Sequence, residues 1–191
     1  MANDALAKTL KAIKLDVEKA MVGVSQAAVV GSASAARKMA SADQMITTTL
    51  DAGSNSTDAL TEAKLLTLHQ TCYEAGSDPS ILMVKPADAG IISGFTTASS
   101  RTRDFGQSKT LTAAIEVLIT SFGTLRVLIN RNQLGSLAYL IDPSMWKQCQ
   151  LRPFTRTLLA KTGDSDHHFV VGETSLKHSS FASCGKITGL S

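Results

Sequence analysis

An amphipathic helix at the start of the chain is the feature that most constrains the fold. Over residues 4–22, apolar side chains recur at steps of three and four, the period of an α-helix with one apolar stripe. The stripe comprises Leu6, Leu10, Ile13, Val17 and Met21. At 3.6 residues per turn the segment makes about five turns, and Gly23 is a natural place for it to end.

The lysines outside this stripe allow two interpretations. They are Lys8, Lys11, Lys14 and Lys19. Asp4 lies four residues before Lys8, which is the spacing of ion pairs along a helix. Lys14 and Glu18 have the same spacing. This alternation favours a solvated surface over a nucleic-acid-binding face, which stays an alternative.

The composition is that of a globular protein. The 191 residues are 43% hydrophobic and 18% charged, enough to bury a core in one large domain or two small ones. The formal charge of +3 falls short of the concentrated basic field expected of a dedicated DNA- or RNA-binding protein. No apolar run reaches the roughly 18 residues of a membrane span, and the start lacks a signal-peptide core. We therefore expect a soluble, unsecreted chain with no membrane partner.

Further elements follow along the chain. Small and polar residues at 24–41 and 47–57 are typical of loops or weak strands. Residues 58–75 predict a second helix with Asp58 or Thr61 as its cap and Gly76 as its stop. One face of that helix carries Leu65, Leu68, Cys72 and Tyr73. A short strand then runs into Pro86, which begins a short helix.

The second half of the chain is rich in strand patterns. Segments 113–120 and 125–131 predict a hairpin that turns at Gly123. Further expected strands lie at 138–142, 150–161, 168–178 and 182–190. Together with the helices, this mostly antiparallel set predicts an α+β fold.

No residue pattern indicates a metal or cofactor. Cys72, Cys149 and Cys184 are far apart in the sequence and have the spacing of ordinary reduced thiols. His167 and His168 are adjacent, so in a strand their side chains point to opposite faces and cannot close on one ion. We expect no metal site and no cofactor.

Catalytic signatures are also weak. Ser183 with Lys186, and Lys161 with the Thr-Gly that follows it, are fragments of the penicillin-binding enzyme signature, but their order along the chain is reversed. Asp142, Asp164 and Asp166 stand in turn-like sequence. We expect no catalytic residue, and a small hydrolase using Ser183 and Lys186 is the weaker alternative.

The stretch YLIDPSMWKQCQLRPFTRTLLAKTGDS, residues 139–165, gathers large and directional side chains. Trp, Tyr and Arg are the residue types that dominate the energetics of protein interfaces. Composition alone leaves it open whether Trp146 and Tyr139 lie in the core or at an interface. The interface candidates are Tyr139, Trp146, Arg152, Phe154 and Arg156, with Arg101 and Arg103 in an upstream loop.

This stretch, with VVGETSLKH and the ending GKITGL, closely resembles the carboxy-terminal half of a family of tailed-phage major head proteins. The likeness extends to DALAKTLKAIKLDVEKAMVG, to ALTEAKLLTLHQTCYEAGSDPSILMVKPADAGIISGF and to TSFGTLRVLINR, so it spans nearly the whole chain. The resemblance implies the capsid fold named after phage Hong Kong 97 and a major capsid subunit without a catalytic residue. Its expected location is the virion, assembled in the bacterial cytoplasm.

The resemblance also implies a division of the chain. Residues 1–56 would form the peripheral domain with its long spine helix, 57–142 mainly the axial domain, and 143–191 the return into the peripheral domain. The expected partners are other copies in hexamers and pentamers, portal and decoration proteins, and packaged double-stranded DNA bound without sequence preference. The family's amino-terminal arm and extended loop precede the spine helix and have no counterpart here, so we expect either a separate chain that supplies them or a truncated gene.

Overall fold

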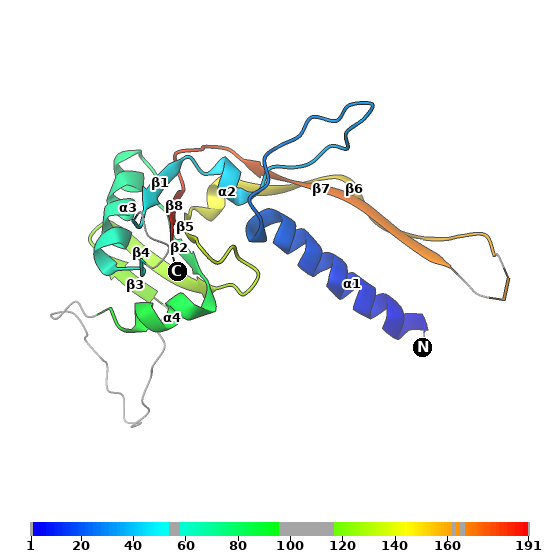
Figure 1. The fold of residues 1–191 in the computed structure, drawn as a ribbon, viewed down its shortest axis with the longest axis horizontal. Helices are drawn as coiled ribbons and strands as arrows, with labels where there is room; N and C mark the ends of the chain where they lie inside the picture. Colours follow the sequence, from blue (N-terminus) through cyan, green and yellow to red (C-terminus); the bar gives the residue numbers. More distant parts are fainter. Residues whose placement is uncertain (1, 54–57, 96–116, 162, 165–166, 191) are drawn as a thin grey trace, which may run out of the picture.

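The structure is a computed structural model that describes residues 2–53, 58–95, 117–161, 163–164 and 167–190 (Figure 1). Its helical elements are α1 (Ala2–Glu18), the π-helical turn η1 (Lys19–Gly23), α2 (Ala42–Met45), α3 (Glu62–Glu74), α4 (Pro86–Ser93) and the 3-10 turn η2 (Pro143–Met145). Its strands are β1 (Thr48–Asp51), β2 (Ile81–Val84), β3 (Val117–Thr120), β4 (Gly123–Ile129), β5 (Ala138–Ile141), β6 (Trp146–Leu158), β7 (His168–His178) and β8 (Gly185–Thr188). The predicted α+β class is confirmed.

A six-stranded mixed sheet forms the body of the molecule, with the strand order β1-β8-β5-β2-β4-β3. Neighbours β2 and β5, β3 and β4, and β5 and β8 are antiparallel. The pairs β1 with β8 and β2 with β4 are parallel. The strands at 48–51 and 185–188, which the expected division placed outside residues 57–142, therefore complete the same sheet.

One face of this sheet carries the main hydrophobic core. Alternate residues of each strand point to this face, for example Leu82 and Val84 of β2. Helix α3 covers it with Leu65, Leu68 and Cys72, all fully or almost fully buried. Tyr73, which the sequence placed on this apolar face, is 55% exposed. That prediction was wrong because position 73 lies one residue beyond the buried stripe, about 100° around the helix.

The opposite face carries a smaller core. Tyr139, Cys184, Ile46 and Leu137 form its buried centre, and Trp146 packs against them while half-buried. The segment that follows α1 and the short helix α2 cover this face. The second core thus joins the sheet to the roots of the parts that project from it.

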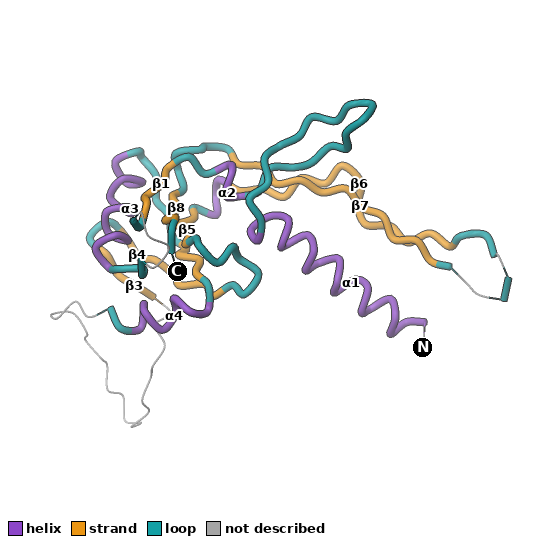
Figure 2. The backbone as a smooth tube through the Cα atoms, viewed as in Figure 1, coloured by secondary structure: helices purple, strands orange, loops and turns teal. Residues whose placement is uncertain are grey.

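Two long elements leave the body. Helix α1 and the β6–β7 hairpin extend from it in the same general direction and end far from the sheet (Figures 1 and 2). The helix predicted over 4–22, ending at Gly23, is confirmed, although its last turn is π-helical. Within the hairpin, the strand expected from residue 150 begins earlier, at Trp146. At about 3.3 Å per residue, the 13 residues of β6 make an arm about 40 Å long.

The arm has an irregular register halfway along. β6 and β7 pair from Trp146 opposite His178 to Leu158 opposite His168, with shifts between Gln150 and Thr155. Pro153 lies within this irregular stretch and has no N–H to donate to the ladder. A bulge at this point increases the local twist of the arm.

Candidate assembly interface

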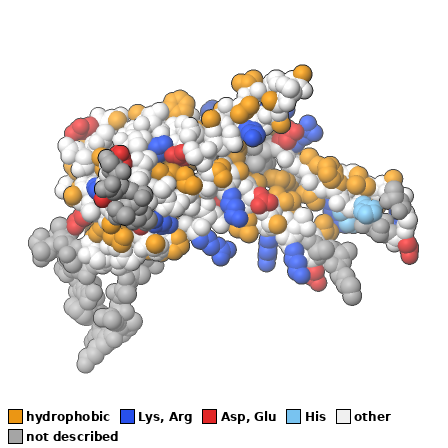
Figure 3. Space-filling model, viewed as in Figure 1, with side chains coloured by type: hydrophobic (Ala, Val, Ile, Leu, Met, Phe, Trp, Pro, Cys, Tyr) orange, Lys and Arg blue, Asp and Glu red, His pale blue; other side chains and the backbone are white. Residues whose placement is uncertain are grey.

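The β6–β7 arm exposes large apolar side chains that its own chain does not cover. They are Leu151, Phe154, Leu158 and Phe169, with Leu151 69% exposed and Phe169 54% exposed. A hairpin of two strands is marginally stable in water without a partner layer. Apolar side chains gather along this arm in Figure 3. Phe169 pairs with Thr157, so it points to the opposite face of the arm from Leu158, and both faces carry exposed apolar side chains. Exposed apolar surface of this kind marks sites of protein association.

Arg152, Phe154 and Arg156, three of the predicted interface residues, lie on this arm and contact the facing strand. Arg152 forms an ion pair with Glu173 at 3.1 Å. Arg156 donates from Nε to Nδ1 of His168 at 3.3 Å, and its Nη2 lies 2.8 Å from Nε2 of the same ring. Both arginines are exposed, so the contacts orient the guanidinium groups along the arm without removing them from solvent.

Phe154 lies flat over a glycine of the facing strand. A β-carbon added at Gly172 would stand 2.3 Å from Cδ1 of the Phe154 ring. Only glycine leaves room for this close approach, and the ring in turn covers the bare backbone, a known device of sheet edges. Gly172 therefore determines where the Phe154 ring lies on the arm.

Trp146 stands at the root of the arm, where it joins the body. Its ring stacks on His178 of the facing strand with centroids 4.0 Å apart and planes at 17°. The indole N–H donates to Cys184 Sγ at 3.1 Å. Burial lowers the pKa of His178, so the stacked imidazole is neutral at physiological pH. These contacts join the root of the arm to the second core through Trp146.

The remaining predicted interface residues fall elsewhere. Tyr139 is fully buried at the centre of β5, and burial raises the pKa of its phenol. Its side chain has no surface to present to another molecule, so its role is in the core and we do not retain it as an interface residue. Arg101 and Arg103 lie outside the described residues.

The last turns of α1 are clamped to the loop that follows β4. The two carboxylate oxygens of Glu18 accept from Nδ2 of Asn130 at 2.8 Å and of Asn132 at 3.0 Å. Gly23 lies so close to this loop that a β-carbon there would be 2.4 Å from the carbonyl oxygen of Asn132. The Glu18 carboxylate thus serves the clamp, and the helix ion pair expected with Lys14 does not form.

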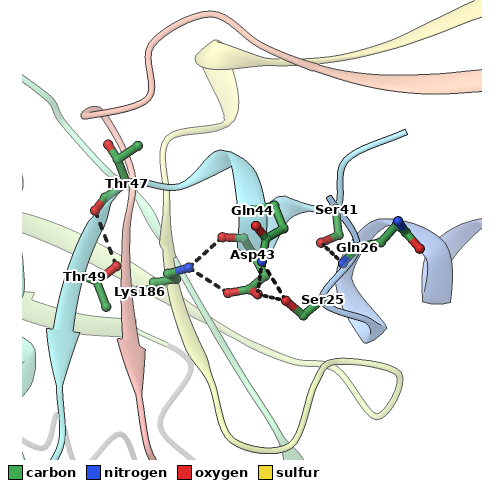
Figure 4. Close-up of polar contacts among 8 residues, drawn as sticks. All are labelled: Ser25, Gln26, Ser41, Asp43, Gln44, Thr47, Thr49 and Lys186. Carbon is green, nitrogen blue, oxygen red and sulfur yellow. Dashed lines mark hydrogen bonds and ion pairs between the residues drawn. The ribbon is translucent and has the colours of Figure 1, made fainter. Parts of the chain in front are cut away.

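A polar cluster ties the segment after α1 to the sheet (Figure 4). Lys186 of β8 donates to Asp43 of α2, with Nζ 2.7 Å from Oδ1 and 2.6 Å from the backbone oxygen. Ser25, just beyond η1, donates to Asp43 Oδ2 at 2.5 Å. The ion-paired side chains are only 13% and 9% exposed. Sequence inspection missed this cluster, because 143 residues separate its two charges.

Burial pushes the pKa of Asp43 upward, but hydrogen bonds from Lys186 and Ser25 outweigh it, and the pKa lies below its usual value of 3.8. Asp43 is therefore ionised throughout the physiological range. The cluster holds α2 against β8, and through Ser25 it also holds the end of the α1 segment.

The enzyme alternative finds no support in these positions. Ser183 donates to the backbone oxygen of Ser180 at 2.8 Å, while the Lys186 amine is bound to Asp43. A nucleophile and its base need to share a hydrogen bond, and these two groups are each engaged elsewhere. Within the described ranges, no three His, Cys, Asp or Glu side chains lie together as metal ligands.

Lysines are exposed along α1, as Figure 3 shows for one side of the molecule. In the part of the chain that the structure describes, no helix is both long enough and apolar enough to cross a lipid bilayer. The projecting surfaces thus offer apolar, aromatic and cationic groups together, a chemistry suited to protein association.

The sequence profile of the SU10 major capsid protein family matches residues 2–191, almost the entire chain. The chain belongs to this phage major capsid family. A curated relative, the major capsid protein of Escherichia phage Phieco32, is 30% identical over 120 residues. That alignment covers 61% of this chain and 34% of the relative, so the chain spans about a third of the length of the relative it matches.

The predicted membership of a phage major capsid family is confirmed. Members of the SU10 major capsid protein family are structural, and the family therefore implies a role without catalysis. The projecting helix and arm carry surfaces that the fold of the chain leaves uncovered, and the body does so as well at β3, where Ile119 is 80% exposed.

Proposed function

We propose that the chain is a self-assembling subunit of the icosahedral head of a tailed phage, built on the Hong Kong 97-type fold. Helix α1 serves as the spine helix and the β6–β7 hairpin as the peripheral arm. The six-stranded sheet with α3 and α4 is the axial domain. On this proposal β1 and β8 belong to the axial domain, whereas the division expected from the sequence assigned their residues to the peripheral domain.

The exposed apolar surface of the arm carries this proposal. Side chains of this size lose favourable burial energy when left in water, at about 25 cal/mol per Å². In a shell they are covered by neighbouring copies through symmetric and quasi-symmetric contacts in rings of five and six. Trp146, Arg152, Phe154 and Arg156 are our candidates for these contacts.

Each contact needs only modest strength. Association entropy offsets much of the gross gain at one interface, whereas closure of a shell multiplies many weak contacts through effective concentration. Portal and decoration proteins are further proposed partners. Packaged double-stranded DNA would meet the inner surface through phosphate contacts without base recognition.

Polar substitution on the arm tests this function. Replacing Leu158 and Phe169 together with serine should abolish particle formation, seen by negative-stain electron microscopy. The melting temperature of the unassembled chain should stay within a few degrees, because both side chains are already exposed.

The matched control is Thr157→Ser, which lies opposite Phe169 in the same arm and keeps its polar character. Particles of normal yield from the Leu158→Ser, Phe169→Ser protein would contradict an assembly role for the arm.

A further inference from the structure

A protruding loop between α1 and α2 has no role in the contacts described so far. We call residues 27–40 the finger. Its two limbs pair through Val29 and Lys38, with N–H···O distances of 3.0 and 3.1 Å. Its tip closes by a hydrogen bond from the Ser32 N–H to the Ala35 carbonyl at 2.9 Å.

The neck of the finger is held by the polar cluster. Gln26 N–H donates to Ser41 Oγ at 3.1 Å, and Ser41 N–H donates back to the Gln26 carbonyl at 2.8 Å. Ser25 and Asp43 flank this pair and bind each other (Figure 4). The two ends of the finger are therefore held together by these hydrogen bonds, and the finger extends away from the body (Figure 1).

The finger presents an apolar side chain beside two cations. Val30 is 90% exposed, the most exposed of the large apolar residues described. The pairing of Val29 with Lys38 places Arg37 opposite Val30 across the limbs. The finger has no acidic residue, and neither Arg37 nor Lys38 has a carboxylate partner among the described residues.

A pocket of complementary chemistry lies at the other side of the body. Tyr73 at the end of α3 and Phe122 in the β3–β4 turn form its aromatic wall, with ring centroids 5.7 Å apart. Asp78 adds a carboxylate that forms no ion pair with a described Lys or Arg and acts on the neighbouring His69 only by its charge. The pocket, of about 740 Å³, is open to solvent and large enough for several side chains.

The finger cannot fill the pocket of its own chain. Figure 1 places the finger beside the roots of α1 and the arm, whereas α3 and the β3–β4 turn lie at the far side of the sheet. The neck contacts hold the finger in that position. We therefore take a second copy of the chain as the occupant of the pocket. Each copy carries one finger and one pocket, so in a shell the two surfaces occur in equal numbers.

We propose that the finger of one subunit inserts Val30 into the Tyr73–Phe122 pocket of a neighbouring copy, with Arg37, which lies across from Val30, facing Asp78 and Lys38 adding its charge beside it. The contact is heterologous, because the two surfaces differ, and such contacts close into rings when the rotation permits. This inference rests on the proposed function and names one interface of the shell. Opposite charges beside an apolar anchor supply register and partner choice.

Charge reversal tests the contact, with self-association of the chain followed by sedimentation velocity. Arg37→Glu with Lys38→Glu should weaken association at least about tenfold, and Asp78→Lys should do the same, because each sets like charges against each other. All three substitutions in one chain should restore association with itself but not with the unmodified chain. Lys8→Glu, an exposed cation on α1 far from the pocket, is the matched control and should change nothing.

Three outcomes overturn the inference while leaving the proposed function intact. The first is normal association of the Arg37→Glu, Lys38→Glu chain, and the second is failure of the triple reversal to restore what the separate reversals remove. The third is a finger variant that loses only salt-dependent binding to duplex DNA, which would show that the finger contacts the genome. An unmodified chain that neither associates nor forms particles overturns the proposed function itself, and the inference with it.

Discussion

At the scale of single residues, one buried charge pair decides how the parts of this molecule are joined. Asp43 and Lys186 come from distant parts of the chain, and both are nearly enclosed. A buried pair of this kind adds little net stability over an apolar pair, but removal of one partner leaves the other charge unpaired. Its main role here is to position other parts of the chain, because it ties Ser25 and the finger to the sheet.

Asp43→Asn should lower the free energy of unfolding by about 1–3 kcal/mol at pH 7, since Lys186 loses its charged acceptor. The difference from the unmodified chain should shrink as the pH falls below about 4. The sign follows from the depressed pKa of Asp43, whose stabilisation is complete above the ordinary value of 3.8 and disappears as the folded chain takes up the proton.

Urea unfolding at pH 7 and pH 3 measures this effect. Asp16→Asn, on the exposed part of α1, is the control and should have almost no effect at either pH. An Asp43→Asn deficit of equal size at both pH values would show that its charge is not the cause.

At the scale of elements, the local sequence pattern predicted the features that depend on neighbouring residues alone, such as helices, helix caps and hairpins. The apolar period of α1, the Thr61 cap of α3, whose Oγ1 accepts from the Lys64 N–H, and the β3–β4 hairpin are all present. Pairing between distant segments was not predictable. The parallel pairing of β1 with β8 joins strands more than 130 residues apart, and nothing in either strand specifies its partner.

The same distinction applies to the candidate site. The sequence drew attention to the arm through its aromatic and arginine content, and Arg152, Phe154 and Arg156 are indeed exposed there. Composition could not separate Trp146, half-buried at the root, from Tyr139, which is in the core. Both side chains pack in the second core, Tyr139 at its buried centre and Trp146 against its edge, and the position of that core is a tertiary property.

Glu18→Ala should release the root of α1 without unfolding the sheet. Asn130 and Asn132 then lose their shared carboxylate, and hydrogen bonds to charged groups contribute about 1.5–3 kcal/mol each. Hydrogen exchange of residues 13–23 should accelerate by about tenfold or more, while peptides covering β2 and β5 keep their protection. Asp16→Ala is the control on the same helix, and equal exchange in the two variants would show that the clamp does not hold α1.

At the scale of the whole molecule, a compact body carries two long projections. The body builds two cores, one on each face of the sheet, and it also leaves apolar side chains exposed, among them Ile119 at 80% and Ile129 at 56%. The arm exposes Leu151, Leu158 and Phe169. On the proposed function, neighbouring subunits would cover these side chains.

Trp146→Ala should disturb assembly or folding more than any single Lys-to-Ala change in α1. The substitution removes the His178 stack and the indole bond to Cys184, at a cost of about 2–4 kcal/mol. Lys11→Ala removes only an exposed side chain and is the matched control. Thermal unfolding and counts of intact particles by electron microscopy would check both, and normal, stable Trp146→Ala particles would contradict the proposed role of the arm's root.

The arm is inserted between two neighbouring strands of the body, and this limits how a change in the arm can affect the sheet. β5 and β8 are neighbours in the sheet, with Leu140 opposite Gly185, so residues 142–184 depart and return between two adjoining strand ends. A change in the length or sequence of this insertion would leave the pairing of β5 with β8 in register. On the proposed function, the contacts between subunits could therefore change while the sheet that carries the arm stays the same.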